Sequence, residues 1–226
     1  MNKSRLLVAA TLSATLAACA TSPTGRKQLM LVSEQQAISA SRQAYVQEMG
    51  KYRQAGKLVD DPKLLRRVEV ITGRLVAQAV KMRPDSARWD WSVAIIDDPK
   101  AVNAWCMAGG RMALYTGLLR QVDPTDDELA QVMAHEIAHA LANHSAERMS
   151  VAMASQAGYD PRAAATLWQK MGAVGGGKSP PAFLSTHPSD QQRQQRLGAL
   201  ASKMMPYYQA PGTRPTHPVR VGAGAA

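Results

Sequence analysis

The sequence predicts a mainly helical α+β fold with a small β-sheet and one central helix. Strand-like segments occur early, between residues 89 and 116, and segments with helical periodicity lie on both sides of them. Hydrophobic residues make up 46% of the 226 positions, which is enough for one domain with a real core. We therefore expect a single folded domain over residues 33–205.

The start signals and periodicities place the elements in order. Ser33 is a good N-cap for a first helix that ends near Arg53, and Pro62 suits the first turn of a second helix. Alternating apolar residues that run into Asp97-Asp98-Pro99 indicate a strand ending in a turn. The expected elements are helices 33–53 and from 61, strand 89–96, an extended segment 103–107, strand 111–116, and helices from 125, 160–171 and 189–204.

The last part of the chain has a different composition. From Pro206 it is rich in proline, glycine and alanine and shows no apolar period. We therefore expect residues 206–226 to be a disordered tail.

The motif His135-Glu136-Ile137-Ala138-His139 is an H-E-x-x-H sequence in a helical setting. Thr125 and Glu128 form a capping box at the start of this helix. Residues four apart project from one helical face, so His135 and His139 can bind one Zn²⁺, with Glu136 beside them as a general base. The alternative is a buried helix that happens to carry two hydrogen-bonded histidines.

The N-terminus indicates export. Residues 1–18 have a short basic start and an apolar run too short to cross a membrane, and Cys19 follows them. This pattern predicts a lipoprotein signal peptide, a lipidated Cys19 and a tether over residues 19–32. Ala20 favours the outer over the inner membrane of the bacterial envelope. The alternative is an ordinary signal peptide followed by an unrelated cysteine.

Two further sequence features bear on partners. If Cys19 carries lipid, Cys106 is alone and no internal disulfide can form. Removing Lys3 and Arg5 with the signal leaves 25 basic and 17 acidic residues, a net charge near +8. Anionic lipid head groups or a merely solvated surface explain this charge. The chain has a single Phe and no basic cluster interleaved with aromatics, so we expect no nucleic-acid partner.

Several blocks in a fixed order resemble the HtpX/BepA-like zinc metallopeptidases, a gluzincin family with periplasmic lipoprotein members. The resemblance covers most of the chain after Cys19, although Ala108 stands where proline is common. The blocks that carry it are 24–29, 103–107 with Gly109-Gly110, 115–119, 135–142, 158–161 and 183–188.

The resemblance implies a zincin-like peptidase domain with one Zn²⁺ per chain. By it, His135 and His139 bind the metal and Glu136 activates a water molecule. The strand from Asn103 would then pair with an extended substrate by β-augmentation, with Gly109 and Gly110 also at the substrate. The alternative is that Asn103, Gly109 and Gly110 only form a turn and do not contact substrate.

The third zinc ligand of this family, a glutamate in a Glu-x-x-Ala-Asp block, is missing. Residues 151–226 contain no glutamate, as though the chain were internally shortened near 150–158. We expect His187 to complete the site as a substitute ligand. Glu147 is a poor candidate, since on a straight helix it lies about 80° from His139 and two turns away. Asp160 precedes Pro161 as an N-cap would.

Two functions follow from these observations. The first is a zinc-dependent endopeptidase of the bacterial cell envelope, which hydrolyses unfolded or misfolded envelope proteins for quality control. The second is a catalytically impaired, lipid-anchored relative that acts as a chaperone or binding module. The resemblance favours the first, and the missing ligand favours the second.

Overall fold

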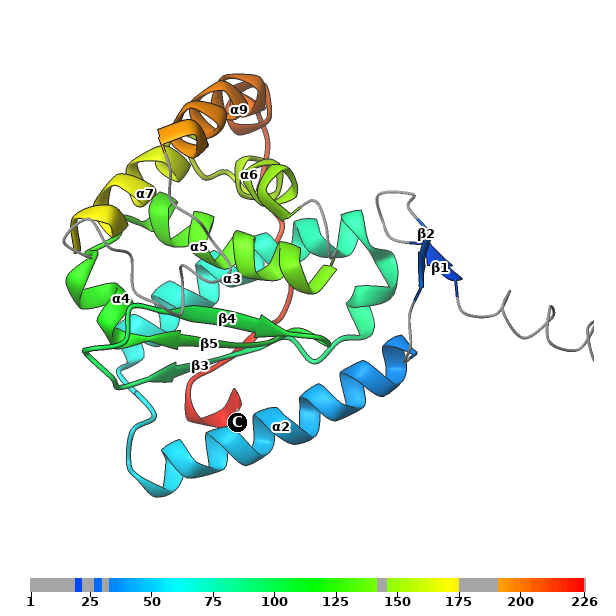
Figure 1. The fold of residues 1–226 in the computed structure, drawn as a ribbon, viewed down its shortest axis with the longest axis vertical. Helices are drawn as coiled ribbons and strands as arrows, with labels where there is room; N and C mark the ends of the chain where they lie inside the picture. Colours follow the sequence, from blue (N-terminus) through cyan, green and yellow to red (C-terminus); the bar gives the residue numbers. More distant parts are fainter. Residues whose placement is uncertain (1–18, 22–26, 30–32, 142–145, 175–190, 226) are drawn as a thin grey trace, which may run out of the picture.

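A mixed four-stranded sheet separates two layers of helices (Figure 1). The structure, a computed structural model, describes residues 19–21, 27–29, 33–141, 146–174 and 191–225. The strand order is β4-β5-β3-β6. β3 is parallel to β5 and to β6, and β4 is antiparallel to β5. The strands are β3 (Ser92–Ile96), β4 (Ala104–Met107), β5 (Arg111–Tyr115) and β6 (Arg220–Val221).

Each face of the sheet packs against its own set of helices. Tyr45 and Met49 of helix α2 (Glu34–Gln54) form a small core with Ala94, Ile96 and Ala113. The alternate side chains of the same strands join a larger core with helices α3 (Pro62–Met82) and α5 (Asp126–Leu141). The period-two alternation of the strands therefore divides the apolar residues between the two faces.

The helix starts confirm the predicted capping residues. The Ser33 Oγ accepts a hydrogen bond from the backbone N–H of Gln36, whose side chain accepts one from the N–H of Ser33. The Asp61 carboxylate accepts a hydrogen bond from the N–H of Leu64 at 2.8 Å, and Pro62 takes the first helical position. Polar side chains that satisfy otherwise unpaired backbone donors thus set where both helices begin.

Three further helices form an outer layer over α5, as Figure 1 shows. They are α6 (Ala146–Gln156), α7 (Ala163–Val174) and α9 (Gln191–Gln209). Helix α9 continues past its expected end near residue 204, with Pro206 inside it. Three short helices complete the described elements: η2 (Pro84–Arg88), α4 (Thr116–Gln121) and η3 (Ala223–Ala225).

The prediction of a disordered tail from residue 206 was wrong. Residues 210–225 run along the body of the protein, and β6 extends the sheet as a neighbour of β3. The Arg220 N–H donates to the Trp91 carbonyl at 3.2 Å, and Val219 is buried. Backbone pairing and a few side chains hold this segment. Such contacts leave no apolar period in the sequence.

The N-terminal predictions fall mostly outside the described residues. Residues 1–18, the expected signal peptide, lie outside the described residues. Within the expected tether, strands β1 (Cys19–Thr21) and β2 (Lys27–Leu29) pair antiparallel. No helix in the described part of the chain is both long enough and apolar enough to cross a membrane.

Candidate metal centre

Helix α5 carries the H-E-x-x-H motif and is fixed firmly at its start. Glu128 and Thr125 exchange the two hydrogen bonds of the expected capping box, at 2.9 and 3.2 Å. The Glu128 carboxylate also accepts hydrogen bonds from Thr166 and Lys170 of helix α7. The predicted apolar stripe of this helix is buried at every position: Leu129, Val132, Met133, Ile137 and Leu141. Anchors at the cap and along one face hold the motif in a fixed orientation.

His135 and His139 point toward each other from successive turns of α5. Their Nε2 atoms are 3.0 Å apart, and the ring planes are inclined by 83°. Two imidazoles that bind one tetrahedral zinc at about 2.0–2.1 Å hold their nitrogens roughly 3.3 Å apart. The observed convergence of two nitrogen ligands on one point therefore fits a zinc ion held by both histidines.

The surroundings of His139 favour its neutral form. Burial lowers the pKa of His139, and the positive charge of Arg193 lowers it further. A neutral imidazole presents the lone pair that a metal ion needs. The environment thus prepares the ring for metal binding at neutral pH.

Glu136 is almost entirely enclosed, with 7% of its surface exposed. Burial raises the pKa of its carboxyl group to about 8. A general base works best when its pKa lies near the working pH, because it can then both take up and release a proton. The position next to His135 and this raised pKa suit Glu136 to proton transfer.

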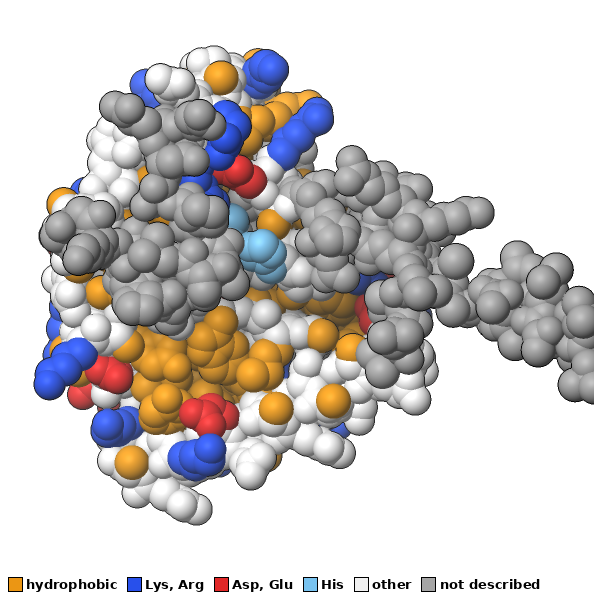
Figure 2. Space-filling view, in the orientation of Figure 1, with side chains coloured by type: hydrophobic (Ala, Val, Ile, Leu, Met, Phe, Trp, Pro, Cys, Tyr) orange, Lys and Arg blue, Asp and Glu red, His pale blue; other side chains and the backbone are white. Residues whose placement is uncertain are grey.

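Strand β4 runs beside this glutamate. The pKa of Cys106 on β4 is raised by burial and then by the negative charge of Glu136, so the two groups are close. In the part of the sheet that the structure describes, β4 is an edge strand. Figure 2 shows histidine surface in the middle of this face and a hydrophobic area next to it. An extended polypeptide could pair with the free edge and reach Glu136.

The three residues predicted to contact substrate have local backbone roles. The Asn103 side chain accepts a hydrogen bond from the Ala104 N–H at 3.0 Å. Gly109 and Gly110 form the turn between β4 and β5 with φ angles of 87° and 85°. A Cβ at Gly110 would lie 2.7 Å from the Trp91 ring. Turn geometry accounts for the two glycines, and contact of the three residues with substrate stays a prediction.

The proposed third ligand, His187, lies outside the described residues, so its role stays a prediction. In the described ranges up to residue 225, no three His, Cys, Asp or Glu side chains are grouped closely enough to hold a metal ion. Asp160 binds the backbone N–H and the side chain of Arg162, as expected of a capping residue. The described residues thus supply two convergent imidazoles, His135 and His139, and the buried carboxyl group of Glu136.

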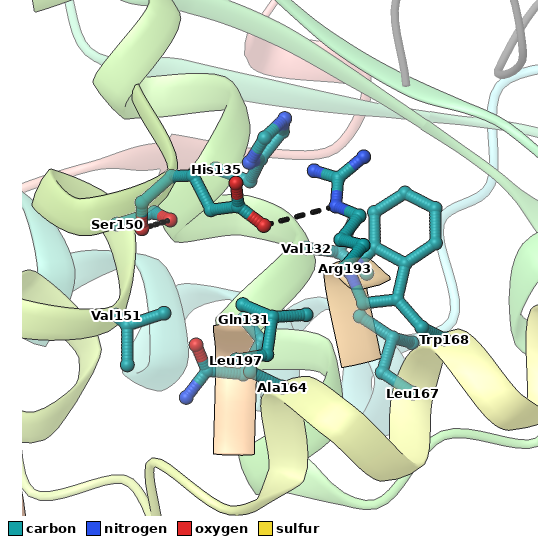
Figure 3. A pocket seen from close by; sticks show the side chains of 11 residues that line it. Gln131, Val132, His135, Ser150, Val151, Ala164, Leu167, Trp168, Arg193 and Leu197 are labelled. Carbon is teal, nitrogen blue, oxygen red and sulfur yellow. Dashed lines mark hydrogen bonds and ion pairs between the residues drawn. The ribbon is translucent and has the colours of Figure 1, made fainter. Parts of the chain in front are cut away.

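The structure adds three side chains that the sequence did not single out as a group. Glu147, Trp168 and Arg193 line one pocket together with His135, and Figure 3 shows Arg193 beside Trp168 there. One signal could have identified Arg193. It shares a helical stripe with residues that the structure buries, Leu197, Ala201 and Met204. A charged residue on an otherwise apolar stripe indicates a specific partner.

This fold and this site define a zincin-like metallopeptidase domain: a small sheet with an edge strand beside an H-E-x-x-H helix. The chain belongs to peptidase family M48, whose profile matches residues 62–156 and 145–201. The two matched pieces overlap at residues 145–156, and the internal shortening near 150–158 stays a prediction.

The similar proteins come from two groups. The mitochondrial metalloendopeptidase OMA1 of Arabidopsis thaliana is 29% identical over 152 residues, covering 47% of this chain and 31% of the relative. OMA1 of Schizosaccharomyces pombe is 31% identical over 156 residues, covering 47% of this chain and 45% of the relative. The beta-barrel assembly-enhancing protease of Yersinia pestis is 33% identical over 105 residues, covering 46% of this chain and 20% of the relative. The chain thus spans less than half the length of each, and both groups, not the HtpX/BepA-like proteins alone, are its relatives.

Proposed function

We propose that this protein is a zinc-dependent endopeptidase of the bacterial cell envelope. The observation that carries the proposal is the convergence of His135 and His139 at 3.0 Å, next to the buried carboxyl of Glu136. The M48 family and the metalloendopeptidase names of the relatives support the same chemistry. His135 and His139 hold the metal, and Glu136 transfers protons.

Each group has a role in peptide hydrolysis. A bound zinc ion supplies a Lewis acid that polarises the peptide carbonyl and makes water more acidic. The Glu136 carboxylate removes a proton from the attacking water and delivers it to the leaving amine. Strand β4 binds the substrate backbone at its free edge and so aligns the scissile bond with Glu136.

The expected substrates are unfolded or misfolded envelope proteins. An extended backbone with unpaired N–H and C=O groups is needed to pair with β4, and unfolded segments offer such a backbone most readily. The hydrophobic area beside the histidines in Figure 2 suits apolar side chains that a folded substrate would bury. Relatives named for assisting β-barrel assembly support substrates of this kind.

A second function is supported by one observation. The described residues bring together two metal ligands of the chain, not three. A relative with an incomplete site would keep the edge strand and the hydrophobic area, and would bind unfolded chains without cleaving them. Metal binding and cleavage distinguish the two functions.

The test is the substitution Glu136→Gln in the full-length protein, purified in detergent and supplied with zinc. Cleavage of unfolded casein should fall by about 10²–10⁴-fold, because the amide cannot accept the proton. Zinc content, measured by atomic absorption, should be unchanged. Glu48→Gln, on the exposed side of α2, is the matched control and should cleave as wild type does. Full activity in Glu136→Gln would refute the role of Glu136.

A further inference from the structure

The two faces of strand β4 have different surroundings. Cys106 lies on the α5 side, where it packs against the large core and its thiol is affected by the charge of Glu136. Trp105 and Met107, its neighbours in the sequence, lie on the opposite side and pack against the small core that contains α2. Successive side chains of a strand point to opposite faces. The edge strand therefore has one side that faces Glu136 and one apolar side that faces α2.

The apolar side is built around Trp105, whose ring is held by two tyrosines. Tyr45 of α2 meets this ring edge-on, with the ring centres 5.8 Å apart and the planes inclined by 80°. The Trp105 Nε1–H donates a hydrogen bond to the Tyr115 hydroxyl oxygen at 3.4 Å. A hydrogen bond with Tyr115 is also the main cause that raises the pKa of Tyr52, so these two hydroxyl groups are in contact. Four aromatic side chains thus fix one another at this part of the sheet.

This aromatic group is not fully buried. Trp105, Met107 and Tyr115 are half-buried, although all three are large. Within the described ranges of the chain, no strand pairs with the outer edge of β4. Figure 2 shows the hydrophobic area over the strands, next to the histidine surface. Apolar surface that is held in a fixed position and left in contact with water is typical of a binding site.

A polypeptide that pairs with the free edge of β4 would contact both sides. Side chains directly opposite each other on paired strands point to the same face. The substrate residue opposite Cys106 therefore points to the side of Glu136, and the residues before and after it lie opposite Trp105 and Met107. Apolar and aromatic pairs across two strands attract each other. The edge thus discriminates between sequences by every second side chain.

We propose that Trp105 and Met107 are specificity-determining residues, which bind apolar or aromatic side chains at alternate positions of an extended substrate. The preferred substrate is a segment with the pattern of an amphipathic β-strand, whose polar side chains face Glu136 and whose apolar side chains face α2. Folded proteins bury the apolar face of such a strand, and unfolded segments expose it. This inference rests on the proposed function, because it takes the β4 edge as the place where substrate binds.

The first experiment measures peptide binding without cleavage, in the Glu136→Gln variant of the full-length protein in detergent. Fluorescence anisotropy compares a peptide of alternating Leu and Thr with one of the same composition in which the Leu residues are consecutive. The alternating peptide should bind about 10-fold more tightly, since several apolar pairs form across the strands, and Trp105→Ala should abolish this preference. Trp105→Phe keeps an aromatic ring and should retain it. Tyr207→Ala, at an exposed aromatic residue of α9, is the control and should not change it.

A second substitution distinguishes a change of recognition from a folding defect. Trp105→Lys places a positive charge on the apolar side of β4. It should shift the preference from the alternating Leu–Thr peptide to an alternating Glu–Thr peptide, because opposite charges attract across paired strands. A misfolded variant would lose binding to both peptides and would not gain a new preference.

The cleavage sites in unfolded casein give a readout that needs no variant. Mass spectrometry of the fragments that the wild type produces should show apolar residues enriched at alternate positions around the cleaved bond. Equal binding of the two Leu–Thr peptides, together with no alternation at the cleavage sites, would overturn the role of Trp105 and leave the proposed function intact. Binding that depends on Trp105 in a wild type that cleaves no casein would support this inference and refute the endopeptidase.

Discussion

Glu128 shows how much one side chain contributes to the orientation of the motif. Its carboxylate is buried and joins the first turn of α5 to Lys170 and Thr166 on α7. Burial acts to raise the pKa of Glu128, but the hydrogen bonds from Lys170, Thr125 and Thr166 together outweigh burial and lower it. The ionised form therefore stabilises the folded state.

We expect Glu128→Gln to lower the free energy of unfolding by about 1–3 kcal/mol at pH 7, because charged hydrogen bonds are lost. The pKa is lower in the folded chain than its ordinary value of 4.5. The contribution is thus complete above that value and disappears as the pH falls through the folded pKa. Thermal unfolding of both proteins at several pH values measures this. A constant difference down to strongly acidic pH would contradict it.

The matched control at this scale is Glu48→Gln, which removes an exposed ion pair with Lys51 on α2. Exposed pairs contribute about 0–1 kcal/mol because water screens them. The variant should therefore unfold close to the wild-type temperature at every pH. Burial, and not the presence of a charge pair, accounts for the contrast between the two glutamates.

At the scale of elements, the sheet depends on a segment far from it in sequence. β6 lies beside β3, where the Gly222 N–H donates to the Val93 carbonyl at 2.9 Å. Arg53 of α2 donates to the Ala223 carbonyl, so the segment also ties α2 to the sheet. The C-terminal residues thus close one edge of the fold.

Deletion of residues 219–226 should lower the free energy of unfolding by about 3 kcal/mol, since it removes the buried Val219 side chain and the backbone hydrogen bonds to β3. Urea unfolding followed by circular dichroism measures this. Thr213→Ala, at an exposed position before β6, is the control and should change stability by less than about 0.5 kcal/mol. A fully stable deletion variant would mean that residues 219–226 do not support the sheet.

At the same scale, helix α6 follows α5 closely in the sequence and packs against it. Periodicity predicted where α5 begins and which of its faces is buried. It did not predict that a second helix would fold back and bring Glu147 to the pocket of His135. The position of α6 depends on its packing against α5, its neighbour in the chain, and against α9, which is far from it in the sequence.

At the scale of the whole molecule, the predicted lipidation of Cys19 bears on where the protein is located. A lipid on its thiol would anchor the domain at a membrane surface, where unfolded envelope proteins are exposed. Two acyl chains give stable anchoring, whereas a protein without them is released. The net charge near +8 that remains without residues 1–18 would add attraction to anionic lipid head groups.

We expect Cys19→Ser to move the protein from the membrane to the soluble fraction and to abolish labelling with radioactive palmitate. Cys106→Ser, at the other cysteine of the chain, should remain membrane-bound and labelled. Fractionation of cells expressing each variant is the measurement. Membrane retention of Cys19→Ser would refute the lipoprotein prediction.

The sequence by itself determined the fold class, most helix and strand starts, and the pair of histidines with its glutamate. These features depend on local rules: a capping side chain, a period of 3.6 or 2, and a four-residue spacing that places two side chains on one face. Local rules act within a few residues, and a single sequence displays them directly.

Tertiary structure decided the rest. It placed β6 in the sheet, although the tail has no apolar period, because backbone pairing with β3 requires little of the sequence. It also gathered Glu147, Trp168 and Arg193 around the pocket of His135, from three different helices. Contacts between residues far apart in the chain depend on how helices pack on one another, and no local pattern encodes that packing.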